Sequence, residues 1–229
     1  MEKSEEEAWV EKIRDLLNNY FSNGASHKHG LHAEVQVKLP YELMLPEFKI
    51  VKKTENVSAL IPYDKSKDES EEEKGKKNEN ERTENSFATD LLIYEDAPGN
   101  EGKVIPRVVV EAKFKKFNTH DPIVYGKKAA AHKVLFPALR YGFMIGANES
   151  KSLTWRLFEH GKDFDFIFSF SSKEPDKDEK TKLKEFYDLV DDEVTSSREL
   201  EQIFKAKSKP LDIYCVHRNL KLSKNTTKK

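Results

Sequence analysis

The fold of this chain is decided by two runs, Phe87-Ala88-Thr89-Asp90-Leu91-Leu92-Ile93-Tyr94 and Val108-Val109-Val110-Glu111-Ala112-Lys113-Phe114. Both runs are apolar and rich in β-branched residues, which is typical of strands. Pro98 and Gly99 lie in the polar segment between them, so the pair predicts a β-hairpin. Side chains alternate across a strand, so Glu111 and Lys113 share one face, and Asp90 falls opposite Glu111 when the hairpin folds about its middle.

These three side chains match the chemistry of metal-dependent phosphodiester hydrolysis. Carboxylates are the ligands that Mg²⁺ prefers, and a lysine beside the metal can position or activate water. The alternative is a surface hairpin with solvated charges, but residues 108–110 predict a strand buried on both faces, where an unpaired carboxylate is costly. The same tripeptide pattern recurs at residues 47–49 and 72–74, without an acidic strand before the first and without apolar residues around the second.

The pattern resembles the PD-(D/E)XK nuclease superfamily, with Asp90 as the first acid and Glu111-Ala112-Lys113 as the E-x-K motif. Thr89 stands where many members have proline, and the resemblance covers the central third of the chain. It implies an α/β domain of restriction-endonuclease type, in which helices flank a mixed central sheet. It also implies that Asp90 and Glu111 hold Mg²⁺ and that Lys113 is catalytic.

The first helix of such nucleases often supplies a further glutamate to the metal, and Glu6 is the best match in this chain. Residues 5–21 predict an amphipathic helix, whose apolar stripe is Trp9, Ile13, Leu16, Leu17 and Tyr20. Ser4 and Glu7 form a capping-box pattern at its start. Glu6 falls on the stripe, so it either points into a cleft or stays solvated, favoured by the helix dipole. Glu7 and Glu11 are its rivals for the metal.

The remaining pattern predicts one domain over residues 1–216, with a small C-terminal α/β elaboration. Strands are expected at 32–39, 45–51, 143–146, 164–170 and 211–216, and helices at 121–141, 180–190 and 197–206. Asp121 and Pro122 predict a capped helix start, and the strand after that helix should lie parallel to the second hairpin strand. Residues 64–86 contain no apolar side chain, which predicts a flexible insertion, and residues 217–229 predict a basic, frayed tail.

Positive charge gathers around the expected site although the whole chain has a formal net charge of −1. Residues 103–140 contain nine Lys and Arg residues but only two acidic residues, which gives this segment a formal charge of about +7. Such a local excess of positive charge is typical of surfaces that bind phosphate. The candidates for DNA backbone contacts are Lys115, Lys116, Lys127 and Lys128, and the alternative is a solvated helix face. In many relatives a polar residue on the helix after E-x-K also faces the active site, which makes Lys128 and His132 candidates. An ordinary core or surface histidine is the more typical explanation of His132.

Composition limits the other classes of function. Cys215 is the single cysteine, so no intramolecular disulfide and no cysteine-based zinc site are expected, and a reducing, cytoplasmic setting is favoured. His27, His29 and His32 fit a loop better than a metal site. No apolar run approaches about 18 residues, so no membrane span is expected.

These features together predict a Mg²⁺-dependent endonuclease acting on double-stranded DNA, of the type II restriction kind. The resemblance implies a homodimer. A domain of a larger restriction or repair complex is a close variant, and RNA is a second possible substrate. The alternative from another class is a module that keeps the nuclease fold and binds nucleic acid or a partner without cutting it.

Overall fold

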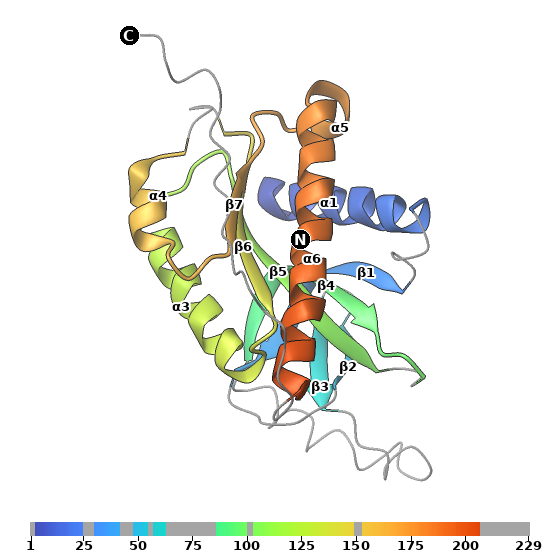
Figure 1. The fold of residues 1–229 in the computed structure, drawn as a ribbon. Helices are drawn as coiled ribbons and strands as arrows, with labels where there is room; N and C mark the ends of the chain where they lie inside the picture. Colours follow the sequence, from blue (N-terminus) through green and yellow to red (C-terminus); the bar gives the residue numbers. More distant parts are fainter. Residues whose placement is uncertain are drawn as a thin grey trace.

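The chain forms an α/β structure in which helices pack on both faces of one mixed sheet (Figure 1). The computed structural model describes residues 3–24, 30–41, 48–54, 57–62, 86–99, 103–148 and 153–206. Its elements are α1 (Glu5–Ser22), β1 (Leu31–Pro40), β2 (Phe48–Thr54), β3 (Val57–Pro62), β4 (Ser86–Asp96), β5 (Val104–Phe114), α3 (His120–Leu135), β6 (Arg140–Gly146), α4 (Trp155–His160), β7 (Phe166–Ser169), α5 (Pro175–Asp178) and α6 (Lys180–Ala206). The α/β class and the mixed sheet with flanking helices are confirmed.

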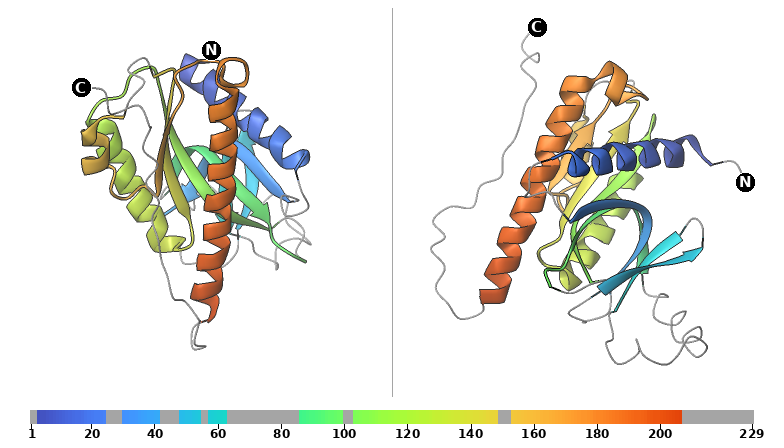
Figure 2. Two further views of the ribbon diagram at one scale, coloured as in Figure 1. Left: turned by 45° about the horizontal axis from the view of Figure 1, so that its top comes forward. Right: turned by 90° about the vertical axis from the view of Figure 1, so that its right-hand side faces the viewer.

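The sheet has seven strands in the order β2-β3-β1-β4-β5-β6-β7. The pairs β2–β3, β1–β4 and β4–β5 are antiparallel, whereas β1–β3, β5–β6 and β6–β7 are parallel. Phe48 of β2 also pairs with Val104 of β5, so the edge of the sheet curls back toward its middle. Figure 2 shows this curl where β1, β2 and β3 turn away from the plane of the other strands.

Two apolar cores lie on opposite faces of the sheet. One contains the stripe of α1 and the inner side of α6, packed on alternate residues of the central strands such as Val108, Val110 and Met144. The other lies under α3 and α4 and contains Val109 and Phe143. Glu111 follows Val109 by two residues, so β5 presents its carboxylate on the α3 side.

The predicted hairpin is confirmed in both extent and register. Leu91 pairs with Val110 and Leu92 with Val109 in the antiparallel β4–β5 ladder, and continuing this register places Asp90 opposite Glu111. β6 lies parallel to β5, as expected for a strand reached through a helical crossover.

The helices α3 and α6 differ from the sequence-based prediction at their boundaries. α3 ends at Leu135, before Pro137, rather than at residue 141, and Thr119 rather than Asp121 occupies its N-cap. Asp121 instead accepts a hydrogen bond from the Asn118 backbone N–H at 2.7 Å. The two helices expected at 180–190 and 197–206 form one helix, α6. Residues 191–196 contain neither Gly nor Pro, and Val194 packs into the core there, so nothing in this segment ends the helix.

The N-terminal helix and strand follow the predicted pattern with one exception. The Ser4–Glu7 capping box is formed at the start of α1. In β1, the backbone of Gln36 has a φ of 53°, which interrupts the smooth alternation expected for residues 32–39. The strand expected at 45–51 is β2, which begins at Phe48, and β3 was not predicted from the sequence.

Several predicted features lie outside the described residues. They are residues 45–47, the insertion up to residue 85, the strand at 211–216 with Cys215, the tail at 217–229, and His27 and His29. Among the helices that the structure does describe, none combines the length and the apolar character that crossing a bilayer requires.

Candidate active site

The predicted catalytic residues come together where β4 and β5 pair at the centre of the sheet. Asp90 lies on β4, and Glu111 and Lys113 lie on β5. The Asp90 Oδ2 atom accepts a hydrogen bond from the backbone N–H of Ala112 at 2.8 Å, which fixes its carboxylate beside Glu111. The neighbouring Thr89 is buried and donates its hydroxyl hydrogen to the Val37 carbonyl at 2.9 Å, so it anchors β4 to β1 next to the site.

Glu111 is fully buried and is held from two sides. The Tyr141 hydroxyl donates a hydrogen bond to its Oε1 atom at 2.7 Å, and the Lys128 ammonium lies 3.3 Å from both of its oxygens. Burial raises the pKa of Glu111 to about 8, and the negative charge of Asp90 adds to this effect. Lys128 and Tyr141 act in the opposite direction but do not compensate for burial. The Glu111 carboxyl is therefore a proton-holding group near neutral pH.

Lys113 is bound by a glutamate from the first helix. Its Nζ atom lies 3.1 Å from Glu6 Oε1, and the other Glu6 oxygen accepts the backbone N–H of Phe114 at 3.1 Å. Partial burial alone would lower the pKa of Lys113, but its contacts with Tyr125 and Glu6 outweigh burial and raise this pKa. Lys113 therefore stays a cation at any pH at which the protein would work.

The packing of Trp9 explains why Glu6 reaches the site. The Trp9 ring lies against the backbone of Gly146, where an added Cβ would come within 2.5 Å of the ring, and 5.7 Å from the ring of Phe114. This contact fixes α1 across the ends of β5 and β6, with Glu6 one turn before Trp9. Of its rivals, Glu7 belongs to the capping box, and Glu11 pairs with Lys3 at 2.7 Å.

The donor set fits a hard divalent cation held by two carboxylates. Asp90 and Glu111 supply adjacent carboxylate oxygens, the ligand type of Mg²⁺, which uses one or two protein carboxylates and keeps several waters. Glu6 faces Lys113 instead, and no group of three or more His, Cys, Asp or Glu side chains suited to a metal occurs among the described residues. A metal-ligand role for Glu6 stays a prediction.

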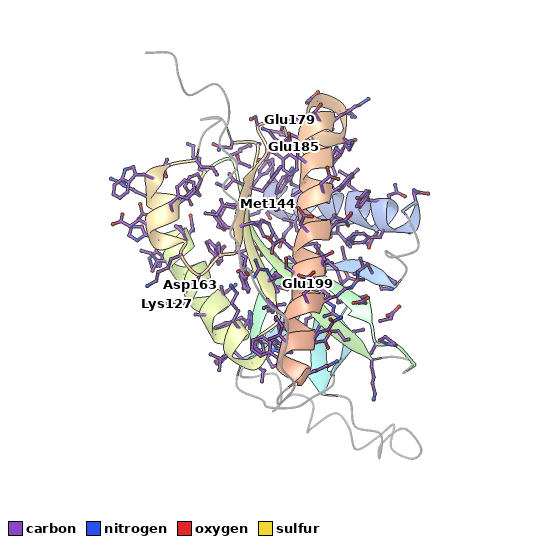
Figure 3. All side chains as sticks on the ribbon, in the orientation of Figure 1. Lys127, Met144, Asp163, Glu179, Glu185 and Glu199 are labelled. Atoms are coloured by element: carbon purple, nitrogen blue, oxygen red, sulfur yellow. The ribbon has the colours of Figure 1, made fainter. Side chains whose placement is uncertain are left out.

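The four lysines proposed to contact nucleic acid have different surroundings. Lys128 points inward to Glu111, and Lys115 is ion-paired with Glu5. Lys116 and Lys127 are exposed, and Lys127 lies on the outer side of α3 (Figure 3). Lys116 and Lys127 therefore remain the better placed of the four for phosphate contacts.

His132, the weaker candidate on α3, is a core residue. It is fully buried, and its Nε2 atom lies 3.1 Å from the Leu39 carbonyl oxygen. Burial lowers its pKa to about 4, so the ring is neutral.

Two tyrosines of the site were not predicted from the sequence. Tyr141 follows a proline-containing turn, and only the parallel register, which pairs it with Val109, places its hydroxyl at Glu111. Tyr125 precedes Lys128 by three residues and so shares its helix face, which is a signal that the sequence did contain. Its ring lies 5.6 Å from the Lys113 ammonium and 5.1 Å from that of Lys128.

Comparisons of the chain with protein-family models, with curated proteins and with solved structures found no match. The geometry of Asp90, Glu111 and Lys113 and their surroundings are therefore the observations from which a function can be inferred.

Proposed function

We propose that this protein is a Mg²⁺-dependent endonuclease that hydrolyses DNA phosphodiester bonds at a PD-(D/E)XK-type site. One observation supports this most strongly: Asp90 and the fully buried Glu111 lie side by side on paired strands, and Lys113 follows Glu111 by two residues on the same face of β5. Two adjacent carboxylates in the interior destabilise the fold unless a cation compensates for their burial. Their presence between the strands is therefore better explained by function than by packing. A carboxyl group whose pKa is raised as strongly as that of Glu111 is typical of functional sites.

In this proposal Asp90 and Glu111 hold the metal ion. Mg²⁺ bound there would polarise a phosphoryl oxygen and lower the pKa of water. Ala112 holds Asp90 through its backbone N–H, and Tyr141 holds Glu111 through its hydroxyl, so both carboxylates keep fixed orientations.

Lys113 acts through its positive charge. Its pKa is raised, so it stays protonated and does not take the proton of the attacking water. As a cation it orients that water and stabilises the negative charge that develops on the phosphate. Glu6 directs the ammonium by holding it at 3.1 Å. Glu6 is then a positioning residue for Lys113, as well as the predicted further metal ligand.

The substrate we infer is double-stranded DNA, contacted through the exposed lysines Lys116 and Lys127. Cutting both strands needs two such sites, and we infer a homodimer that supplies them.

The test is incubation of the pure protein with supercoiled plasmid, with linear duplex DNA and with RNA, each with Mg²⁺ and with EDTA. We expect nicked and linear plasmid with Mg²⁺ and none with EDTA. Discrete fragments would indicate a restriction-type enzyme, whereas a smear of fragments would indicate a nonspecific nuclease. Cleavage of RNA but not of DNA would show that the substrate is RNA.

One observation favours the second candidate, a binding module that does not cut. The Lys128 ammonium already offsets part of the charge of Glu111, so the carboxylates have a cation without a metal. Binding of DNA without cleavage in Mg²⁺ or Mn²⁺ would support this module and refute the enzyme.

A further inference from the structure

Lys128 has a place in the site that neither phosphate binding nor packing explains. Its Nζ atom is equidistant, at 3.3 Å, from the two oxygens of Glu111, and it donates a hydrogen bond to the Ala88 carbonyl at 3.0 Å. The ring of Tyr125 lies on another side of it, 5.1 Å away. Oxygen atoms from β4 and β5 and an aromatic face from α3 thus surround the ammonium, as donors surround a bound cation.

The charges of the site show which group this ammonium serves. Lys113 is held by Glu6, so its charge is shared with that carboxylate. Lys128 is therefore the cation in direct contact with Glu111, the carboxylate that lies next to Asp90 on the paired strands. Two neighbouring carboxylates in a buried site repel each other, and a cation in contact with one of them relieves part of this repulsion.

We propose that Lys128 is an internal cation that occupies the carboxylate site and competes with the divalent metal for Glu111. This inference rests on the proposed function, because it concerns the same metal site. A metal that takes the oxygens of Glu111 must displace the ammonium or tolerate its positive charge nearby. Either way Lys128 lowers the metal affinity of the free protein.

The same arrangement connects metal binding to DNA binding. The Lys128 side chain keeps a fifth of its surface exposed, and lysine carries a compact charge on a flexible stem. A backbone phosphate at the site offers the displaced ammonium a new partner. DNA then raises metal affinity, and the metal raises DNA affinity by the same factor, because coupling of two binding equilibria is reciprocal.

The experiment measures Mg²⁺ affinity by isothermal titration calorimetry on the full chain without DNA. It is performed at several pH values up to about pH 10, and the protons released are measured as well, because removal of Lys128 raises the pKa of Glu111 and so strengthens competition from the proton. Lys128→Met removes the charge and keeps most of the apolar stem. Lys128→Gln also removes the charge and can still donate to Ala88, so it serves if the first variant fails to fold. Lys128→Arg keeps the charge, and Lys184→Met removes an exposed lysine of α6, outside the site, as the control.

Once proton release is accounted for, we expect both neutral variants at position 128 to bind Mg²⁺ about tenfold more tightly than the wild type, since one neighbouring charge shifts an ionic equilibrium by about one to three powers of ten. Lys128→Arg and Lys184→Met should stay within about twofold of the wild type. As a second readout, Mg²⁺ affinity in the presence of a short DNA duplex should increase in the wild type and increase much less in Lys128→Met.

The outcomes separate this inference from the proposed function. If the wild type binds Mg²⁺, Asp90→Asn does not, and Lys128→Met binds as the wild type does, the competition by Lys128 is refuted while the metal site stands. Weaker binding by the neutral variants would show that Lys128 positions Glu111, and would also refute it. Absence of Mg²⁺ binding in the wild type together with tight binding in Lys128→Met would support it. Absence of binding in every protein would overturn both.

Discussion

Replacement of Tyr141 by phenylalanine tests the protonation of Glu111 with the smallest possible change. The Tyr141 hydroxyl donates to Glu111 Oε1 at 2.7 Å inside the core, and the substitution removes only that oxygen. A buried hydrogen bond to a charged group is worth roughly 1.5–3 kcal/mol, and about 1.4 kcal/mol corresponds to a tenfold change in an ionisation constant. The pKa of Glu111, already about 8, should therefore become higher by about one to two in Tyr141→Phe.

Metal affinity reports this change because the carboxyl must lose its proton to bind a cation. At pH 7 a group with a pKa of about 8 is ionised in roughly one molecule in ten, so Mg²⁺ binding by the wild type should strengthen about tenfold between pH 7 and pH 9. At a pH below the pKa, every further increase of the pKa by about one weakens binding by about tenfold. Tyr141→Phe should thus bind Mg²⁺ about 10- to 100-fold more weakly than the wild type at pH 7, and much of the difference should disappear as the pH rises.

Isothermal titration calorimetry at a series of pH values, in buffers with different ionisation enthalpies, measures both the affinity and the protons released. Close to one proton should leave per Mg²⁺ bound at pH 7. Tyr125→Phe is the control, because that hydroxyl contacts Lys113 rather than donating to Glu111. Affinities independent of pH between 6 and 9, or an equal loss in Tyr141→Phe at every pH, would refute a proton-holding Glu111.

Three further predictions follow from the contacts of the site. Between about pH 4.5 and 8 the folded protein holds a proton on Glu111 that the unfolded chain does not, so the free energy of unfolding in EDTA should fall as the pH rises. Glu111→Gln should lack this dependence on pH and should melt at a higher temperature than the wild type at pH 8. A lower melting temperature for this variant would contradict the raised pKa of Glu111. Gly146→Ala places a Cβ within 2.5 Å of the Trp9 ring, which should lower the free energy of unfolding by about 1–3 kcal/mol and displace Glu6. The melting temperature and the cleavage rate should therefore both fall. An unchanged melting temperature would show that α1 is not held at this contact. Replacing the exposed Lys116 and Lys127 by Glu reverses their charge, which should weaken DNA binding and reduce its dependence on salt concentration. Lys113→Met should instead keep its affinity for DNA in Ca²⁺ within a few-fold of the wild type and lose cleavage in Mg²⁺. Equal losses of DNA binding and cleavage in Lys113→Met would show that Lys113 only binds phosphate.

The hairpin and its acids could be predicted from the sequence because their determinants are local. Strand alternation places Glu111 and Lys113 on one face, and folding the two runs about the turn at Pro98 and Gly99 brings Asp90 close to the level of Glu111. The register shift between Ile93 and Tyr94, which fixes their final pairing, was not predicted. The capping box likewise depends on residues three positions apart, Ser4 and Glu7.

The surroundings of Glu111 depend on tertiary packing and are not evident in the sequence. Tyr141 reaches the carboxylate through the register of β6 on β5, and Lys128 through the way α3 lies over the sheet. Lys128 was predicted both as a phosphate contact and as a polar residue of this helix that faces the site; the structure agrees with the second prediction, but the contact with Glu111 itself was not predicted. The continuous α6 shows the same limit, because a polar segment that weakens the helical pattern remains helical when Val194 packs into the core.

The most direct measurement of the central claim is the rate of Mg²⁺-dependent plasmid cleavage by Asp90→Asn, taken together with its DNA affinity in Ca²⁺. Asn retains a side-chain oxygen that can accept the Ala112 N–H hydrogen bond, so the fold should persist while the negative charge is lost. If Asp90 and Glu111 hold the catalytic metal, the cleavage rate should fall by about a thousandfold or more, with a melting temperature and DNA affinity close to those of the wild type. Cleavage by Asp90→Asn at a rate near that of the wild type would show that the chemistry, if any, takes place elsewhere in the molecule.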